Sequence, residues 1–149
     1  MKIAIGCDKL GVYLKKNIIS FLQNKDSVEI FDCGADEGED IDYPIVAERV
    51  AVSIIEGKAD RGILICGTGI GMAITANKIP GIRAAQVFDP YSAERARRSN
   101  NAQIMTLGSL IIGVESAKCL VNIWLNCEFS GGRSTRKVEK ISEIEGKYR

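Results

Sequence analysis

The chain has 149 residues, the length of one domain, and its 46% apolar and 26% charged residues are typical of a globular protein. The formal net charge of +1 argues against a general nucleic-acid binder, which usually carries a strongly basic face. No apolar run approaches the ~20 residues of a membrane span and the N-terminus lacks a signal-peptide pattern, so we expect one cytoplasmic domain over residues 1–149.

The predicted elements alternate between short apolar strands and amphipathic helices. A strand over residues 3–6 precedes a helix over 12–22, and a second strand over 28–32 leads into an acidic, glycine-containing loop over 33–43. A helix then spans 44–56, with a proline in its first turn, where the missing N–H is tolerated.

The strongest strand signal is at residues 61–66, a near-continuous apolar run of the kind buried on both faces of a parallel sheet. A glycine-rich turn and a helix over 70–78 follow it. The remaining predicted elements are strands over 82–87 and 103–107 and helices over 91–98, 114–126 and 134–147. Strands and helices that alternate with short links predict an α/β fold with a doubly wound parallel sheet.

Five cysteines and no histidine restrict the chemistry that is open to the chain. The cysteines are an odd number without a Cys-x-x-Cys pair, which argues against a disulfide framework or a zinc knuckle. Without histidine, Ser-His-Asp and Cys-His nucleophiles and the usual histidine metal sites are excluded. Proton transfer near neutral pH then requires a thiol, a carboxylate, a lysine or a tyrosine. Cys119 and Cys127 lie in or beside an apolar helix and are expected in the core.

Four segments with polar residues lie in loops that follow predicted strands, at residues 7–9, 42–43, 66–71 and 89–91. The carboxyl ends of parallel strands meet at one edge of a sheet, and ligands bind in the crevice outside that edge. We therefore expect these four segments to converge on one site.

The sharpest of the four is Cys66-Gly67-Thr68-Gly69-Ile70-Gly71. Alternating glycines let the backbone turn tightly and approach a ligand, and the free N–H groups of the following helix suit an anion. They also favour a thiolate at Cys66, and Thr68 is able to donate a hydrogen bond or to cap the helix. The pattern fits neither the Gly-x-Gly-x-x-Gly fingerprint nor the Walker pattern, so an anion-handling site and a plain strand–helix turn both stay open.

Two further groups have both a structural and a functional interpretation. Asp8 is either a helix N-cap or a ligand of sugar hydroxyls. Arg133, Arg136 and Lys137 follow a Gly-Gly turn at a predicted helix start, where they form either a phosphate clamp or a solvated basic surface.

A series of short motifs falls in order along essentially the whole chain. They are Gly6-Cys7-Asp8, Asp42-Tyr43-Pro44, residues 63–71, Ala76-Asn77-Lys78, Gly81-Ile82-Arg83-Ala84, Tyr91-Ser92-Ala93, Asn100, Gly108, Trp124-Leu125 and Gly131-Gly132-Arg133. Together they resemble the type B ribose-5-phosphate isomerases and the related galactose-6-phosphate isomerase subunits. The resemblance implies a Rossmann-like three-layer αβα fold with a five-stranded parallel sheet and a C-terminal helix.

The same resemblance implies a homodimer, or a tetramer formed by two dimers, with shared active sites. The implied reaction is aldose–ketose isomerisation of a sugar phosphate through an enediolate, without metal or cofactor, with ribose 5-phosphate and ribulose 5-phosphate as the default pair. Cys66 is implied as the catalytic base, and Thr68 as a residue that assists near the sugar oxygens. The implied substrate contacts are the N–H groups of Gly67, Gly69, Ile70 and Gly71, the side chains of Asp8, Tyr43 and Asn100, and the phosphate ligands Arg133, Lys9 and Lys137.

The chain departs from the family pattern where histidines are usual. Lys9 and Ser134 stand in two such places, and Ser99 stands where a histidine commonly opens the sugar ring; Lys137 replaces an arginine. The two lysines still bind phosphate as point charges, but a serine is a poor acid or base near pH 7.

The departures leave several expectations open. Another group, such as Asp8 acting through water, opens the ring; or the substrate reaches its open-chain form readily; or the substrate is a hexose 6-phosphate such as galactose or allose 6-phosphate. From a different class of function, a sugar-phosphate-binding protein with impaired catalysis also fits these residues.

Overall fold

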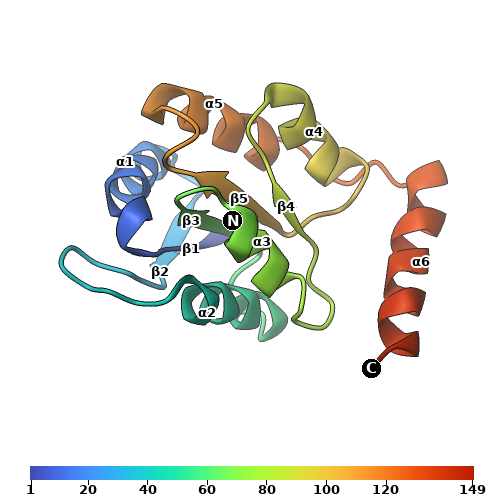
Figure 1. Ribbon diagram of the computed structural model, residues 1–149. Helices are drawn as coiled ribbons and strands as arrows, with labels where there is room; N and C mark the ends of the chain where they lie inside the picture. The colour runs from blue at the N-terminus through green and yellow to red at the C-terminus, as the bar shows by residue number, and fades with distance from the viewer.

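A five-stranded parallel sheet lies between two layers of helices in the computed structural model, which describes residues 1–149 (Figure 1). The strand order is β2-β1-β3-β5-β4, and every neighbouring pair is parallel. The strands are β1 (Lys2–Cys7), β2 (Glu29–Asp32), β3 (Arg61–Cys66), β4 (Ala84–Gln86) and β5 (Ile104–Gly108). The three-layer fold expected from the sequence is confirmed.

Six α-helices connect and follow the strands. They are α1 (Val12–Gln23), α2 (Tyr43–Ile55), α3 (Ile70–Ala76), α4 (Pro90–Arg98), α5 (Val114–Leu125) and α6 (Arg133–Lys147), with a short 3-10 helix, η1 (Lys9–Gly11), before α1. Figure 1 shows α4 and α5 on one side of the sheet and α2 and α3 on the other. None of these helices is long and apolar enough to cross a membrane.

Alternation of side chains along the central strands divides the core into two parts. Ile63 and Ile65 of β3 pack in the larger cluster, with α1, α4 and α5. Leu64 and Cys66 point to the opposite face and pack with α2 and α3. Every residue of β3 is buried, as its apolar run predicts for a central parallel strand. Cys66 therefore ends a rigid, fully covered strand.

Three details differ from the sequence-based expectations. β4 is shorter than 82–87 because the Arg83 N–H donates to the Gln103 side chain. α3 ends before residue 78 because the Asn77 side chain pairs with both the N–H and the C=O of Ala84, which turns the chain into β4. Cys119 is exposed on α5 and not in the core, whereas Cys127 is buried as expected.

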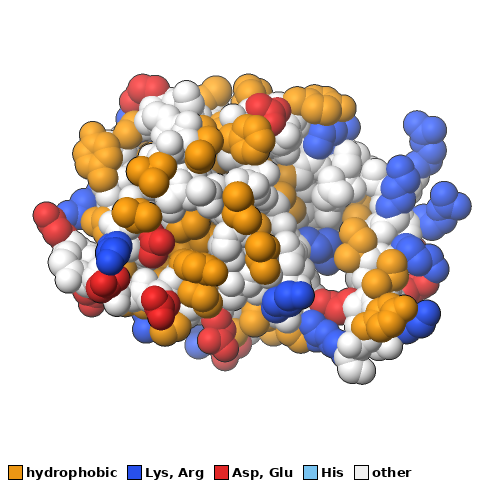
Figure 2. Space-filling model, in the orientation of Figure 1, with side chains coloured by type: hydrophobic (Ala, Val, Ile, Leu, Met, Phe, Trp, Pro, Cys, Tyr) orange, Lys and Arg blue, Asp and Glu red, His pale blue; other side chains and the backbone are white.

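Helix α6 contributes no buried side chain. Near its C-terminal end the Glu145 carboxylate accepts the Gly81 N–H at 3.0 and 3.2 Å, while Ile141 and Ile144 stay 45% and 53% exposed. Figure 1 shows α6 on the side of the molecule opposite to the loop after β2, and Figure 2 shows lysine and arginine side chains gathered along it. The helix thus has an apolar side that this chain covers only in part and a basic side that faces water.

Candidate active site

The carboxyl ends of the neighbouring strands β1 and β3 bring two of the predicted segments together. The Asp8 N–H, directly after β1, donates to the Ile65 carbonyl oxygen of β3 at 3.2 Å. Cys66 is the next residue of β3, so the expected convergence of residues 7–9 and 66–71 is confirmed at this edge of the sheet. Residues 89–91 follow β4 at the same edge, two strands from β3.

The turn after β3 wraps its backbone around the Cys66 sulfur. Cys66 is 5% exposed, and its Sγ accepts the Gly69 N–H at 3.1 Å. Gly69 has φ +80°, and a Cβ there would lie 3.1 Å from the Leu107 backbone, so both conformation and space require glycine. The hydrogen bond fixes the sulfur against the backbone of the turn.

Four N–H groups in and just after the same turn, those of Gly67, Thr68, Gly71 and Met72, donate to no other group of the chain and are left for a ligand. In the first turn of α3 the Ile70 N–H donates to Thr68 Oγ1 at 3.2 Å and the Ala73 N–H donates to the Gly69 carbonyl. The N–H groups of Gly71 and Met72 have no partner within the helix, because the residues four positions earlier precede it. Backbone donors beside a buried thiol form a site for an oxyanion next to a proton acceptor.

Tyr43 enters the site from α2. A Cβ on Gly71 would lie 2.6 Å from Tyr43 Cε2, so the missing side chain of Gly71 is what lets the phenol ring lie against the turn. Tyr43 is the first residue of α2 and is 41% exposed, which leaves its ring accessible to a ligand. The expected convergence of residues 42–43 on the turn is therefore confirmed for Tyr43.

Asp8 and Lys9, which follow β1, lie beside the turn. Asp8 Oδ1 accepts the N–H groups of Leu10 and Gly11 at 3.0 and 3.2 Å, so of the two alternatives for Asp8 the helix cap is present. Burial raises the pKa of Asp8 from its ordinary value, against the opposite effect of these two hydrogen bonds. Lys9 is exposed, pairs with Asp40 at 2.9 Å and lines a cavity of about 550 Å³.

Cys7, the last residue of β1 and the neighbour of Asp8, is buried and not available to a ligand. Its Sγ donates to the Ala35 carbonyl, and burial raises the pKa of its thiol to about 11. The folded chain thus keeps a proton that the unfolded chain releases near pH 9, so the thiol's contribution to stability is present below about pH 9 and is lost as pH rises toward about 11. We expect the thermal midpoint to fall across this window.

The Cys7→Ala variant serves as the comparison, because it has no thiol to titrate. Its thermal midpoint, followed by circular dichroism, should fall less between about pH 9 and about pH 11 than that of the unaltered chain. Equal slopes for the two proteins would contradict the assignment.

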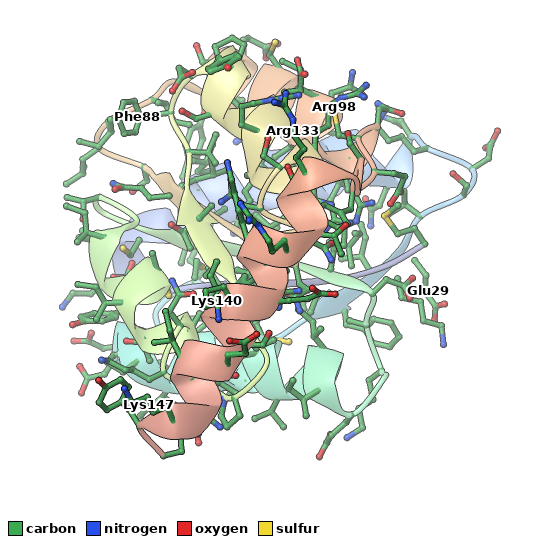
Figure 3. All side chains as sticks on the ribbon, turned by 90° about the vertical axis from the view of Figure 1, so that its right-hand side faces the viewer. Glu29, Phe88, Arg98, Arg133, Lys140 and Lys147 are labelled. Carbon is green, nitrogen blue, oxygen red and sulfur yellow. The ribbon has the colours of Figure 1, made fainter.

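The remaining predicted residues lie elsewhere on the chain. Ser99 and Asn100 lie between the end of α4 and the start of β5, at the amino ends of the strands and away from Cys66. The Ser130 N–H donates to the Arg98 carbonyl, which holds the turn before Arg133 beside them. Figure 3 shows Arg98 near Arg133 at the start of α6. The structure therefore separates the predicted site into two halves within one chain.

The second half is a basic groove. Arg133, Arg136 and Lys137, with Gly132 and Ser134, line an open cavity of about 720 Å³. The preceding glycines have φ +66° and +60°, a left-handed turn that residues with a side chain rarely adopt, and it starts α6 with these cations side by side. The groove has the charge and donors for a phosphate.

The half of the site around Cys66 also contains residues that the sequence does not predict. Gln86, at the end of β4, donates from Nε2 to the Thr68 carbonyl at 2.8 Å. Leu10 and Leu110 both lie against Gly67 and are 51% and 72% exposed. Other exposed apolar side chains at this edge are Ile70, Phe88, Tyr91 and Ile111. Figure 2 shows hydrophobic side chains spread across this face. A contiguous exposed apolar patch is typical of a surface that another protein covers. The sequence does not reveal it, because exposed single apolar residues are common in all proteins.

Comparison with known proteins gives consistent matches over the full length. Residues 3–141 match the family model described as Ribose/Galactose Isomerase. The chain is 57% identical over 149 residues to the Ribose-5-P isomerase B of Listeria innocua, with 100% of both chains covered. It is 52% identical over 146 residues to a D-erythrulose-4-phosphate isomerase of Pectobacterium atrosepticum, covering 97% of this chain and 95% of that one. A solved ribose-5-phosphate isomerase B of Clostridium thermocellum superposes with a TM-score of 0.97 at 46% identity, over 100% of both chains.

Proposed function

Because the chain belongs to the Ribose/Galactose Isomerase family, whose members are aldose–ketose isomerases, we propose that it interconverts an aldose phosphate and a ketose phosphate with Cys66 as the base. The observation that carries the proposal is the Cys66 sulfur held by the Gly69 N–H, beside backbone donors that are free for an oxyanion. D-ribose 5-phosphate and D-ribulose 5-phosphate are the first candidate pair, supported by the name of the Listeria innocua relative.

In the proposed reaction the Cys66 thiolate removes a proton from the carbon next to the substrate carbonyl. The C–H electron pair forms a carbon–carbon double bond and the carbonyl electrons move to oxygen, which gives an enediolate. The N–H groups of Gly71 and Met72 stabilise the oxyanion, and the Thr68 hydroxyl relays a proton between the two substrate oxygens. The Cys66 thiol then returns its proton to the neighbouring carbon, which regenerates the thiolate and completes the isomerisation.

A second copy of the chain supplies the phosphate site in this proposal. Arg133 and Lys137 lie at the edge of the sheet opposite to Cys66, so one chain alone does not bring them to the same substrate. The exposed apolar residues around the turn and the half-exposed apolar side of α6 support a homodimer in which these surfaces are covered. Ser99 and Asn100 then reach the sugar from the neighbouring chain.

A second substrate is favoured by a specific observation, the serine at position 99 in a chain without histidine. Opening a furanose ring requires proton transfer to the ring oxygen near neutral pH, which a serine hydroxyl performs poorly. In D-erythrose 4-phosphate the phosphate occupies the oxygen that would close a five-membered ring on C1, and D-erythrulose 4-phosphate, with its carbonyl at C2, has no hydroxyl that would close one, so both stay open-chain. The name of the Pectobacterium atrosepticum relative supports this four-carbon pair.

Turnover of both pairs by the purified protein tests the function and separates the two substrates. If unassisted ring opening limits the pentose reaction, kcat/KM for D-erythrulose 4-phosphate should exceed that for D-ribose 5-phosphate by about tenfold or more. The Ser99→His variant should then raise turnover of D-ribose 5-phosphate and leave turnover of D-erythrulose 4-phosphate unchanged. A higher kcat/KM for the pentose in the unaltered chain would instead assign the pentose as the substrate.

Galactose 6-phosphate and allose 6-phosphate complete the substrate panel. Measurable binding of sugar phosphates without turnover of any of them would reject the isomerase and leave a sugar-phosphate-binding protein. The Cys66→Ala variant provides the matched blank for uncatalysed isomerisation in each assay.

A further inference from the structure

The peptide unit between Thr68 and Gly69 is held from both sides. Its carbonyl oxygen accepts a hydrogen bond from Gln86 Nε2 at 2.8 Å, and its N–H donates to Cys66 Sγ at 3.1 Å. The C=O and N–H of a planar trans peptide point in opposite directions. The side chain that fixes the carbonyl oxygen therefore also fixes the direction of the N–H toward the sulfur.

The next peptide unit, between Gly69 and Ile70, is fixed in the same way. The Thr106 hydroxyl, fully buried on β5, donates to the Gly69 carbonyl oxygen at 2.8 Å, and the Ile70 N–H donates to Thr68 Oγ1. Gly69 itself has φ +80° and no side chain to restrict it. Thus two side chains, one from β4 and one from β5, hold the two peptide planes on either side of the most permissive residue of the turn.

We propose that Gln86 and Thr106 are positioning residues, which aim the Gly69 N–H at the Cys66 sulfur and so set how readily this thiol gives up its proton. The inference rests on the proposed role of Cys66 as the base and adds two residues that touch neither the substrate nor the sulfur. A hydrogen bond to a charged acceptor contributes more than one to a neutral acceptor, so a misaligned N–H destabilises the thiolate more than the thiol.

The other charged or titratable side chains at this edge of the sheet remain unchanged in the variants that test the proposal. Asp8 and Lys9 follow β1, Tyr43 begins α2, and Asp89 follows β4; α3 carries no titratable side chain. Lys9 is paired with Asp40, and Asp8 caps η1. Substitution of Gln86 or Thr106 changes none of these charges, so a change in the titration of Cys66 reports the hydrogen bonds of the turn.

The Gln86→Leu and Thr106→Val variants remove the two donors while keeping similar side-chain size. For each variant, thiolate absorption in the ultraviolet is recorded as a function of pH. The curve of the same variant carrying Cys66→Ala is then subtracted, and the difference reports Cys66 without the other four cysteines. We expect the pH of half-ionisation to rise by about one unit in each variant, a tenfold loss of thiolate fraction below that pH. kcat at neutral pH should fall about tenfold with little change in KM.

Gln103→Leu is the matched control. Gln103 also holds a loop through its side-chain amide, accepting the Arg83 N–H and donating to the Gly81 carbonyl, but at the opposite edge of the sheet. Its titration should superimpose on that of the unaltered chain. A Cys66 titration that Gln86→Leu and Thr106→Val leave unchanged overturns the proposal, even if both variants lower the thermal midpoint. The titration needs no substrate, so a shifted titration without any sugar-phosphate turnover would reject the proposed function and retain this inference.

Discussion

The Cys66→Ala variant is expected to lose about 10³-fold in kcat, because it removes the group proposed to carry the proton between the two substrate carbons. KM should change much less, because the backbone donors of the turn and the basic groove remain. The measurement is steady-state turnover of D-erythrulose 4-phosphate and D-ribose 5-phosphate. Circular dichroism should show an unchanged fold.

Cys119→Ala provides the matched cysteine control, since Cys119 is exposed on α5, remote from the turn. It should retain full activity. If the Cys66→Ala variant kept more than about a tenth of the unaltered kcat, general base catalysis by this thiol would be excluded and a carboxylate such as Asp8 would become the leading candidate.

The Arg133→Ala variant is expected to raise KM about 100-fold, because a guanidinium at the start of α6 binds a phosphate with two hydrogen bonds that alanine cannot replace. Arg149→Ala is the control, because Arg149 lies just beyond the C-terminal end of α6 and pairs with Glu145. It should leave KM unchanged. An unchanged KM for Arg133→Ala would remove the basic groove from the substrate site.

Mixing the two defective chains tests whether the site is shared. In a random mixture of Cys66→Ala and Arg133→Ala chains, half of the dimers are mixed, and each mixed dimer has one intact site if Cys66 and Arg133 come from different chains. Activity should then recover to about a quarter of that of the unaltered protein at limiting substrate. A site contained within one chain would give no recovery above the two separate variants.

The sequence predicts most of the fold because its signals are local. The apolar run of β3 and the glycines after it predict a buried strand, a tight turn and a helix, and each is present. The sequence places the ends of β4 and α3 wrongly. These ends depend on the side chains of Gln103 and Asn77, which form hydrogen bonds with residues on the other side of a loop. Such contacts leave no periodic pattern in the sequence.

The candidate site is predictable only in part, for the same reason. Cys66 and Asp8 are found together because parallel strands end at one edge, a rule that a strand assignment is enough to apply. Gln86 has no such signal, since it is one residue of a short strand and its contact with Thr68 depends on strand order. The position of Ser99 was foreseeable, because α4 returns the chain to the amino ends of the strands.

The most direct test of the account is isomerisation of D-erythrulose 4-phosphate and D-ribulose 5-phosphate in deuterium oxide, followed by nuclear magnetic resonance. Proton transfer through Cys66 and an enediolate predicts aldose product from the unaltered chain, with deuterium at C2 in the fraction of turnovers in which the Cys66 thiol exchanges its proton with solvent before returning it, and no product above the blank for Cys66→Ala. Equal rates of deuterium incorporation by the two proteins, or the absence of any isomerisation by the unaltered chain, would contradict it.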